Sequence, residues 1–143
     1  MIQPAGETTE QTKETQQKEP KKILLADDNN ELIETLELIL VSQGFATSSA
    51  CDGVEAKHQI EKDQDRIFDC VITDVLMPGL SGWDLLRWLR TLPKYHSHRM
   101  ILMSGVNYES DRFKDESLQP FIYLCKPFGL DDLLEAIQKA LAQ

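Results

Sequence analysis

The sequence lacks any apolar run that approaches the roughly 20 residues needed for a membrane-spanning helix. Its first 20 residues also lack the apolar segment of a secretory signal. The 143-residue chain has a net charge of −9 and no cluster of Lys and Arg, which argues against binding to nucleic acid or to an anionic membrane surface. We therefore expect a cytoplasmic protein that contacts neither nucleic acid nor membrane.

Motifs of several common protein classes are also missing. The three cysteines (Cys51, Cys70 and Cys125) are widely spaced and form no CxxC pair, so they predict reduced thiols that pack as small hydrophobic side chains. The motifs GxGxxG and GxxxxGKS/T do not occur, which argues against a nucleotide-binding module. His96 and His98 have no further ligands beside them and are expected to be solvated.

Residues 1–20 differ in composition from the rest of the chain. They consist mainly of Thr, Gln, Glu and Lys, and a segment with so little to bury cannot offset the entropy lost on ordering. We expect a disordered tail or linker over residues 1–20. The remaining residues, 21–143, have the length and the apolar content of a single domain with one core.

Apolar runs alternate with amphipathic segments from Lys21 onward. Short continuous apolar runs are typical of strands buried on both faces, and apolar residues at helical spacing predict helices between them. Predicted strands cover residues 23–26, 45–50, 68–73, 100–103 and 121–125. Predicted helices cover approximately residues 32–43, 53–62, 83–92, 107–118 and 131–142, the first with an Asn cap before it and Gly44 after it. This alternation predicts an α/β fold with a doubly wound, five-stranded parallel sheet and five helices.

Polar residues collect at the ends of four predicted strands. Asp27 and Asp28 follow the first strand, Asp74 the third, Ser104 the fourth and Lys126 the fifth. The carboxyl ends of parallel strands form one edge, where open α/β sheets bind ligands. Three carboxylates at one edge repel each other unless a cation intervenes, and a hard divalent cation such as Mg²⁺ suits them.

Such a site is suited to phosphoryl transfer. Asp74 can act as a nucleophile and form an aspartyl phosphate. Mg²⁺ can hold one phosphoryl oxygen and the Lys126 ammonium a second, while the Ser104 hydroxyl or nearby backbone N–H groups can hold the third. An isolated Asp pair is more often a helix cap, and a lone lysine is more often a surface residue, but their placement at matching strand ends favours the site interpretation.

Several short segments together resemble the signature of the response-regulator receiver family. They are Asp27-Asp28, Asp74-Val75-Leu76-Met77-Pro78, Ser81-Gly82, Ser104-Gly105 and Lys126-Pro127-Phe128. They occur in the family's order and extend the resemblance over residues 21–143. The resemblance implies a flavodoxin-like sheet with strand order 2-1-3-4-5. The family's Lys-Pro peptide bond is usually cis, and an X-Pro bond permits this.

The resemblance also implies a metal site. Asp28 would bind Mg²⁺ directly and Asp27 mostly through a water molecule. Asp74 and the backbone carbonyl of Leu76 would complete the set of protein ligands. Asp74 would be the phosphoacceptor, and Lys126 would be the phosphate partner.

A conformational switch is implied as well. Ser104 would be the switch hydroxyl and Tyr123 the switch aromatic, although an aromatic residue in a strand more often has only a packing role. Phosphorylation would draw Ser104 inward, let Tyr123 turn, and change the surface formed by residues 107–118, 121–125 and 131–142. The same surface is a candidate for homodimer formation.

The residue type at Leu76 affects two predictions, one on hydrolysis of external substrates and one on hydrolysis of the chain's own aspartyl phosphate. Phosphohydrolases that use an aspartyl phosphate need a second Asp two residues after the nucleophile, and Leu76 occupies that position. We therefore expect no enzyme activity beyond the chain's own phosphotransfer and dephosphorylation. In the family, Leu76 and Val106 would flank the path of the hydrolytic water, and their apolar side chains predict slow self-hydrolysis.

The resemblance implies a phosphohistidine donor on a sensor histidine kinase or a histidine phosphotransfer protein. We expect the receiver of a hybrid sensor histidine kinase, because residues 1–20 resemble an inter-domain linker and no effector domain follows Gln143. A stand-alone response regulator is the alternative. A phosphorylation-independent interaction module is less favoured, because such proteins usually lack one of the acids or the lysine.

Overall fold

The computed structural model of the chain describes residues 19–62, 67–95, 97–98, 100–105 and 118–142. These residues contain one five-stranded sheet. Its strands are β1 (Lys22–Ala26), β2 (Ala46–Ala50), β3 (Cys70–Asp74), β4 (Met100–Ser104) and β5 (Phe121–Cys125). All neighbouring strands are parallel, and their order is β2-β1-β3-β4-β5. The predicted fold class and strand order are confirmed.

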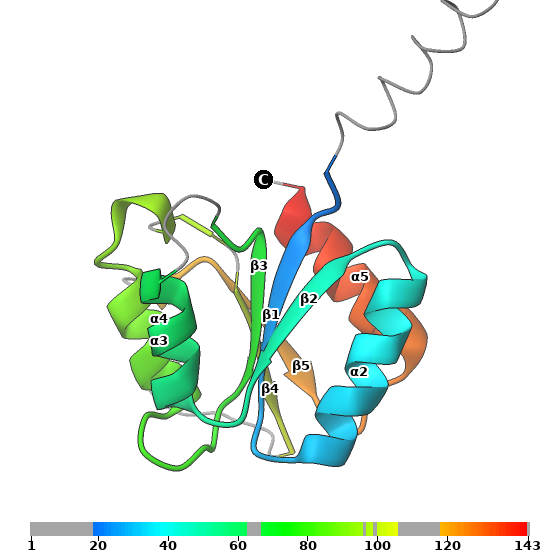
Figure 1. Cartoon of the computed structure of the whole chain (residues 1–143), viewed down its shortest axis with the longest axis horizontal. Helices are drawn as coiled ribbons and strands as arrows, with labels where there is room; N and C mark the ends of the chain where they lie inside the picture. The colour runs from blue at the N-terminus through cyan, green and yellow to red at the C-terminus, as the bar shows by residue number, and fades with distance from the viewer. Residues whose placement is uncertain (1–18, 63–66, 96, 99, 106–117, 143) are drawn as a thin grey trace, which may run out of the picture.

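Helices cover both faces of the sheet (Figure 1). The helices α3 (Gly53–Lys62) and α4 (Gly82–Leu89) lie on one face, and α2 (Asn30–Ser42) and α5 (Leu130–Leu141) lie on the other. A short 3-10 turn, η1 (Pro93–Tyr95), follows α4. The described residues therefore contain four of the five predicted helices.

Two sequence predictions concern residues that the structure leaves almost wholly undescribed. They are the tail over residues 1–20 and the helix over residues 107–118. Both stay predictions. Within the described ranges, no helix combines the length and the apolar character that crossing a membrane requires.

The core has two layers, because the side chains along each strand point alternately to one face of the sheet and to the other. Leu24 and Val71 pack in the cluster under α3 and α4, whereas their neighbours Leu25 and Ile72 pack in the cluster under α2 and α5. Successive side chains of a strand point to opposite faces. Because both faces are covered, both sets of side chains must be apolar, which explains the continuous apolar runs in the sequence.

Local capping explains where the helices begin. The Asn29 side-chain oxygen accepts a hydrogen bond from the Leu32 amide (3.2 Å) at the start of α2. The Ser81 hydroxyl accepts one from the Asp84 amide (3.1 Å) at the start of α4. After α2, Gly44 adopts φ +95°, a left-handed conformation that favours glycine. The predicted Asn cap and glycine stop are confirmed.

The helix α4 ends earlier than predicted. The sequence indicated a helix as far as Leu92, but the α-helix ends at Leu89. The Thr91 and Leu92 amides donate to carbonyls three residues earlier, at 2.9 and 3.0 Å, which is the tighter 3-10 pattern. The tightening precedes Pro93, because a proline disfavours the α conformation in the residue before it.

The carboxyl ends of the central strands lie together. Ala26 of β1 pairs with Thr73 of β3, and Asp74 at the end of β3 pairs with Met103 of β4. This edge is at the bottom of Figure 1, where α2 begins. The strand ends and the loops that follow them therefore bring the polar residues of distant sequence segments to one place.

Candidate functional site

Three carboxylates converge at this edge. Asp27 and Asp74 are buried, with 1% and 8% of their surface exposed, whereas Asp28 is exposed. Each of the three offers an oxygen, and these oxygens all lie within 4.8 Å of one another. The three acids that the sequence placed at strand ends are thus close enough to share one ligand.

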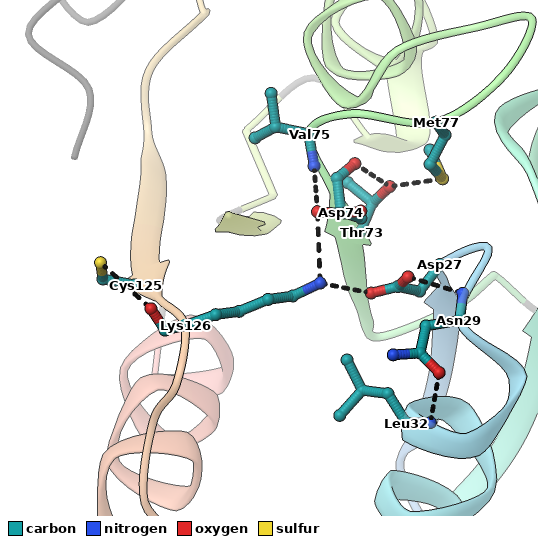
Figure 2. Close-up of polar contacts among 9 residues, drawn as sticks. All are labelled: Asp27, Asn29, Leu32, Thr73, Asp74, Val75, Met77, Cys125 and Lys126. Atoms are coloured by element: carbon teal, nitrogen blue, oxygen red, sulfur yellow. Dashed lines mark hydrogen bonds and ion pairs between the residues drawn. The ribbon is translucent and has the colours of Figure 1, made fainter. Parts of the chain in front are cut away.

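Lys126 extends from the end of β5 to two of these acids (Figure 2). Its Nζ donates a hydrogen bond to Oδ2 of Asp27 at 2.8 Å and lies 3.5 Å from Oδ1 of Asp74. The Lys126 amide donates to the Ser104 carbonyl (2.7 Å), which fixes the backbone from which the side chain starts. The Lys126-Pro127 peptide bond is cis. One ammonium therefore lies between two carboxylates.

Backbone donors orient both buried carboxylates. The Val75 amide donates to Oδ1 of Asp74 (3.0 Å) and also to the Met103 carbonyl (2.9 Å). The Asn29 amide donates to Oδ1 of Asp27 (2.9 Å). These contacts hold each carboxylate where its strand ends. No sequence pattern indicates the Val75 contact, because its donor is a backbone amide, which every residue type except proline has.

The charges at the site are not balanced. Burial raises the pKa of Asp74, and the Asp27 charge raises it further, while Lys126 offsets part of this rise. Burial works against the charge of Lys126, but the hydrogen bond and charge of Asp27, followed by the charge of Asp74, leave the pKa of Lys126 above its ordinary value. The Asp74 anion is thus destabilised even with the ammonium beside it.

This donor set fits a hard divalent cation. Carboxylate oxygens are the ligands that Mg²⁺ takes in proteins, and Mg²⁺ retains several waters. The exposed position of Asp28 leaves room for such waters, and a second positive charge would relieve the crowding that raises the pKa of Asp74. Leu76, whose carbonyl is a predicted ligand, lies two residues after Asp74 and is 62% exposed. The ligand roles themselves stay predictions.

The two predicted switch residues share a face of the sheet. Ser104 ends β4 and is buried. Tyr123 of β5 is in register with Leu102, which lies two residues before Ser104, so alternation places Ser104 and Tyr123 on the same side. Tyr123 is partly buried against the cluster under α3 and α4. A shared face is necessary for the coupled movement that the sequence predicts.

Gly82 has a geometric role that sequence reasoning did not find. A Cβ added to it would lie 2.9 Å from the Cα of Val75 and would overlap the Asp74 carbonyl oxygen. The Gly82 amide donates to the Val75 carbonyl (2.8 Å). The start of α4 is therefore pressed against the backbone of Asp74. Glycine is unfavourable within a helix, so its presence at the start of α4 was the sequence feature that could have indicated this close contact.

Comparisons with known proteins agree on one family. The family model described as response regulator receiver domain matches residues 23–138. The transcriptional regulatory protein TctD of Salmonella typhimurium (strain LT2) is 34% identical over 116 residues, which cover 78% of this chain and 48% of TctD. This chain thus spans about half the length of the curated relatives it matches.

Solved structures have the same fold. A response regulator receiver domain protein of Clostridium thermocellum aligns with a TM-score of 0.71 at 30% identity, covering 85% of this chain and 94% of that one. The receiver domain of sensor histidine kinase PA1611 of Pseudomonas aeruginosa PAO1 aligns with a TM-score of 0.74 at 24% identity, covering 87% and 99%. That crystal structure contains a magnesium ion coordinated in its active-site cleft.

Proposed function

Because this chain belongs to the response-regulator receiver family of two-component signalling proteins, we propose that its Asp74 carboxylate accepts a phosphoryl group from a phosphohistidine donor, with Mg²⁺ as the cofactor. One observation carries this proposal. A single ammonium, that of Lys126, lies between Asp27 and Asp74, and the third carboxylate, that of Asp28, has an oxygen within 4.8 Å of those of the other two.

The protein groups divide the work of transfer. An Asp74 oxygen attacks the phosphorus, the P–N bond to the donor imidazole breaks, and the released imidazole takes up a proton. The Val75 amide holds the Asp74 carboxylate in place, since it donates to Oδ1. Lys126, which forms an ion pair with Asp27, neutralises one phosphoryl oxygen. Asp27, Asp28, Asp74 and the Leu76 carbonyl would hold Mg²⁺, which would supply further charge neutralisation.

The readout of phosphorylation lies in Ser104 and Tyr123. The new phosphoryl oxygens accept a hydrogen bond from the Ser104 hydroxyl, which moves toward them and leaves space for Tyr123. This movement changes the relative populations of two conformations of the surface that includes β5 and α5. That surface is also our candidate for homodimer contacts. The placement of Ser104 and Tyr123 on one face supports this part of the proposal.

The chain acts on its own aspartate and turns over no external substrate. A phosphohydrolase of similar chemistry needs a general acid two residues after the nucleophile. Leu76 occupies that position, with an exposed apolar side chain that has no proton to give.

The proposed context is a hybrid sensor histidine kinase, with residues 1–20 as the linker and a kinase or phosphotransfer protein as the donor. The polar composition of that segment supports it, and the PA1611 receiver is an example of the same fold in a sensor histidine kinase. An immunoblot of the source cells tests this context. A band much larger than this chain is expected, and a band of this chain's own size would favour a stand-alone regulator.

Phosphorylation itself is tested with acetyl phosphate and Mg²⁺. Intact-mass spectrometry should show the addition of one phosphoryl group to the wild-type protein and none to Asp74→Asn. Asp131→Asn is the matched control, because Asp131 is an exposed carboxylate in the first turn of α5. Equal labelling of Asp74→Asn, or labelling that persists after Mg²⁺ is chelated, would contradict the proposal.

A further inference from the structure

The first residue of α3 touches the loop that follows Asp74. Residues 75–81, here called the acceptor loop, connect β3 to α4. Gly53 is buried at the start of α3, and a Cβ added to it would lie 2.7 Å from the Cβ of Leu80 and would overlap the Leu80 carbonyl oxygen. The overlap involves backbone atoms, so no rotation of a side chain can relieve it. Only glycine fits between α3 and this loop.

The next residue of α3 extends the same contact. Cγ2 of Val54 lies 3.3 Å from a Cβ added to Gly79, although 60% of Val54 is exposed. Gly79 has φ +79°, so the acceptor loop turns at this point through a conformation that favours glycine. Two consecutive residues of α3 therefore lie against two consecutive residues of the acceptor loop.

The start of α3 is itself firmly held. Oδ1 of Asp52 accepts a hydrogen bond from the Glu55 amide (2.7 Å), and Oε1 of Glu55 accepts one from the Cys51 amide (2.7 Å). Just before this turn, the Ala50 carbonyl accepts a hydrogen bond from the Asp27 amide (3.2 Å). The surface on which the acceptor loop rests is thus connected through the backbone to Asp27.

The two ends of the acceptor loop are fixed by different partners. Its first residue, Val75, is hydrogen-bonded to β4 and to Gly82, whereas Leu80 near its other end rests on Gly53. Leu76 lies between these two points. Glycine in a helix is about 1 kcal/mol less favourable than alanine, so helix propensity alone would favour a larger residue at position 53. The close approach of the loop accounts for the glycine.

We propose that Gly53 is a positioning residue for the phosphoacceptor site, because the approach of the acceptor loop to α3 that it permits sets the Leu76 carbonyl for Mg²⁺. This inference rests on the proposed function. A larger residue at position 53 displaces the acceptor loop and weakens metal binding without touching any of the three carboxylates.

The test is a titration of the Gly53→Ala variant with Mg²⁺ alone, in which calorimetry measures the binding affinity. Mg²⁺ should bind about tenfold more weakly than to the wild type, as when a group that orients a ligand is altered. Gly129→Ala is the matched control, because an added Cβ there meets only the Asp132 carboxylate at an ordinary 3.8 Å. It should bind Mg²⁺ as the wild type does. Thermal melting of both variants separates loss of binding from loss of folding.

Each outcome decides between the claims. Wild-type affinity in a folded Gly53→Ala variant overturns the positioning role and leaves the proposed function intact, whereas failure of the wild type itself to bind Mg²⁺ overturns the proposed function. If Gly53→Ala does not fold, Val54→Ala replaces it in the test. Val54 is mostly exposed, so truncation of its side chain leaves the core unchanged. It should weaken Mg²⁺ binding about threefold, and an unchanged affinity overturns the inference.

Discussion

The Lys126 ammonium lies 2.8 Å from the Asp27 carboxylate and 3.5 Å from that of Asp74. The residue proposed as the phosphate partner is therefore also paired with a carboxylate that is 1% exposed. The ion pair joins the end of β5 to the end of β1, two strands that are not neighbours in the sheet. Lys126 thus has a structural role before any phosphoryl group arrives.

Replacement of Lys126 by methionine tests this structural role. The variant keeps most of the length of the side chain and leaves two nearly buried carboxylates without their cation. Its free energy of unfolding without Mg²⁺ should fall by about 2 kcal/mol, and Mg²⁺ should restore part of the loss. Urea unfolding with and without Mg²⁺ measures both effects.

The matched control for Lys126→Met is Lys139→Met on α5. Lys139 and Glu135 form an exposed pair 4.0 Å apart, and such pairs contribute less than about 1 kcal/mol. Equal losses of stability in the two variants would show that the Lys126 pair has no special weight in the fold.

The raised pKa of Asp74 predicts a pH-dependent stability in the absence of metal. Burial and the Asp27 charge raise this pKa in the folded state above its ordinary value of 3.8. Asp74 therefore keeps its proton to higher pH in the folded state than in the unfolded state. As a consequence, the contribution of Asp74 to stability falls as the pH rises from 3.8 through the folded-state pKa. Asp74→Asn removes this penalty.

Asp74→Asn should thus unfold at the same urea concentration as the wild type near pH 3 and at a higher concentration at pH 7. Mg²⁺ at pH 7 should remove or reverse the difference, because it binds the wild-type carboxylate. Urea midpoints across this pH range provide the measurement. A difference that is constant with pH would rule out titration of Asp74 as its source.

Most of the architecture could be predicted because burial on two faces leaves a strong pattern. The runs in β1, β3 and β4 are buried throughout or nearly so, and such runs have few alternatives to a central parallel strand. The edge strand β2, with sequence ATSSA, is only partly buried, and the sequence placed its start one residue early, at Phe45. The residues of the candidate site could be located because Asp74 and Ser104 end their strands, and Asp27 and Lys126 directly follow theirs.

What the sequence could not indicate are contacts between segments far apart along it. The fit of Gly53 against Leu80 depends on how α3 lies on the sheet, and no local pattern encodes that distance. The Tyr95 hydroxyl accepts a hydrogen bond from the Phe68 amide (2.8 Å), a contact made across 27 residues. The hydrogen bonds that Arg90 donates to the Leu118 and Pro120 carbonyls are similar contacts, made across 28 and 30 residues.

Arg90 predicts a stability effect far from the phosphoacceptor site. Its guanidinium donates to the Tyr95 carbonyl (2.9 Å), the Leu118 carbonyl (3.1 Å) and the Pro120 carbonyl. The planar fork of arginine makes these three contacts together, and a lysine cannot reproduce them. Arg90→Lys should lower the free energy of unfolding by about 2 kcal/mol. Phosphorylation of Asp74 should be unaffected at temperatures where the variant is folded.

Arg87→Lys, in the helix that ends just before Arg90, is the control for Arg90→Lys. Arg87 is exposed, and its ion pair within the described part of the chain is with Asp84, three residues earlier, at 3.3 Å. Its replacement should change stability by less than about 0.5 kcal/mol. Chemical denaturation of both variants gives the comparison. If Arg90→Lys is as stable as Arg87→Lys, the three backbone contacts contribute nothing measurable.

The side chain of Leu76 predicts how long the phosphoryl group remains. Leu76 is 62% exposed, two residues after Asp74, and its side chain has no donor or acceptor with which to orient an attacking water. Val106, the second apolar residue predicted to flank the water path, lies outside the described residues. Leu76→Asn keeps the backbone carbonyl proposed as a metal ligand and adds an amide, which can orient water as a glutamine does in GTPases. Dephosphorylation should become about tenfold faster.

A second substitution separates orientation of the water from its access. Leu76→Ala removes bulk but adds no polar group, so its rate of dephosphorylation should stay close to that of the wild type. The decay of labelled phospho-Asp74 in Mg²⁺, after removal of the donor, measures all three rates. If alanine accelerates the decay as much as asparagine does, Leu76 slows hydrolysis by shielding the phosphoryl group from water. An unchanged rate in Leu76→Asn would instead mean that this position does not control the lifetime.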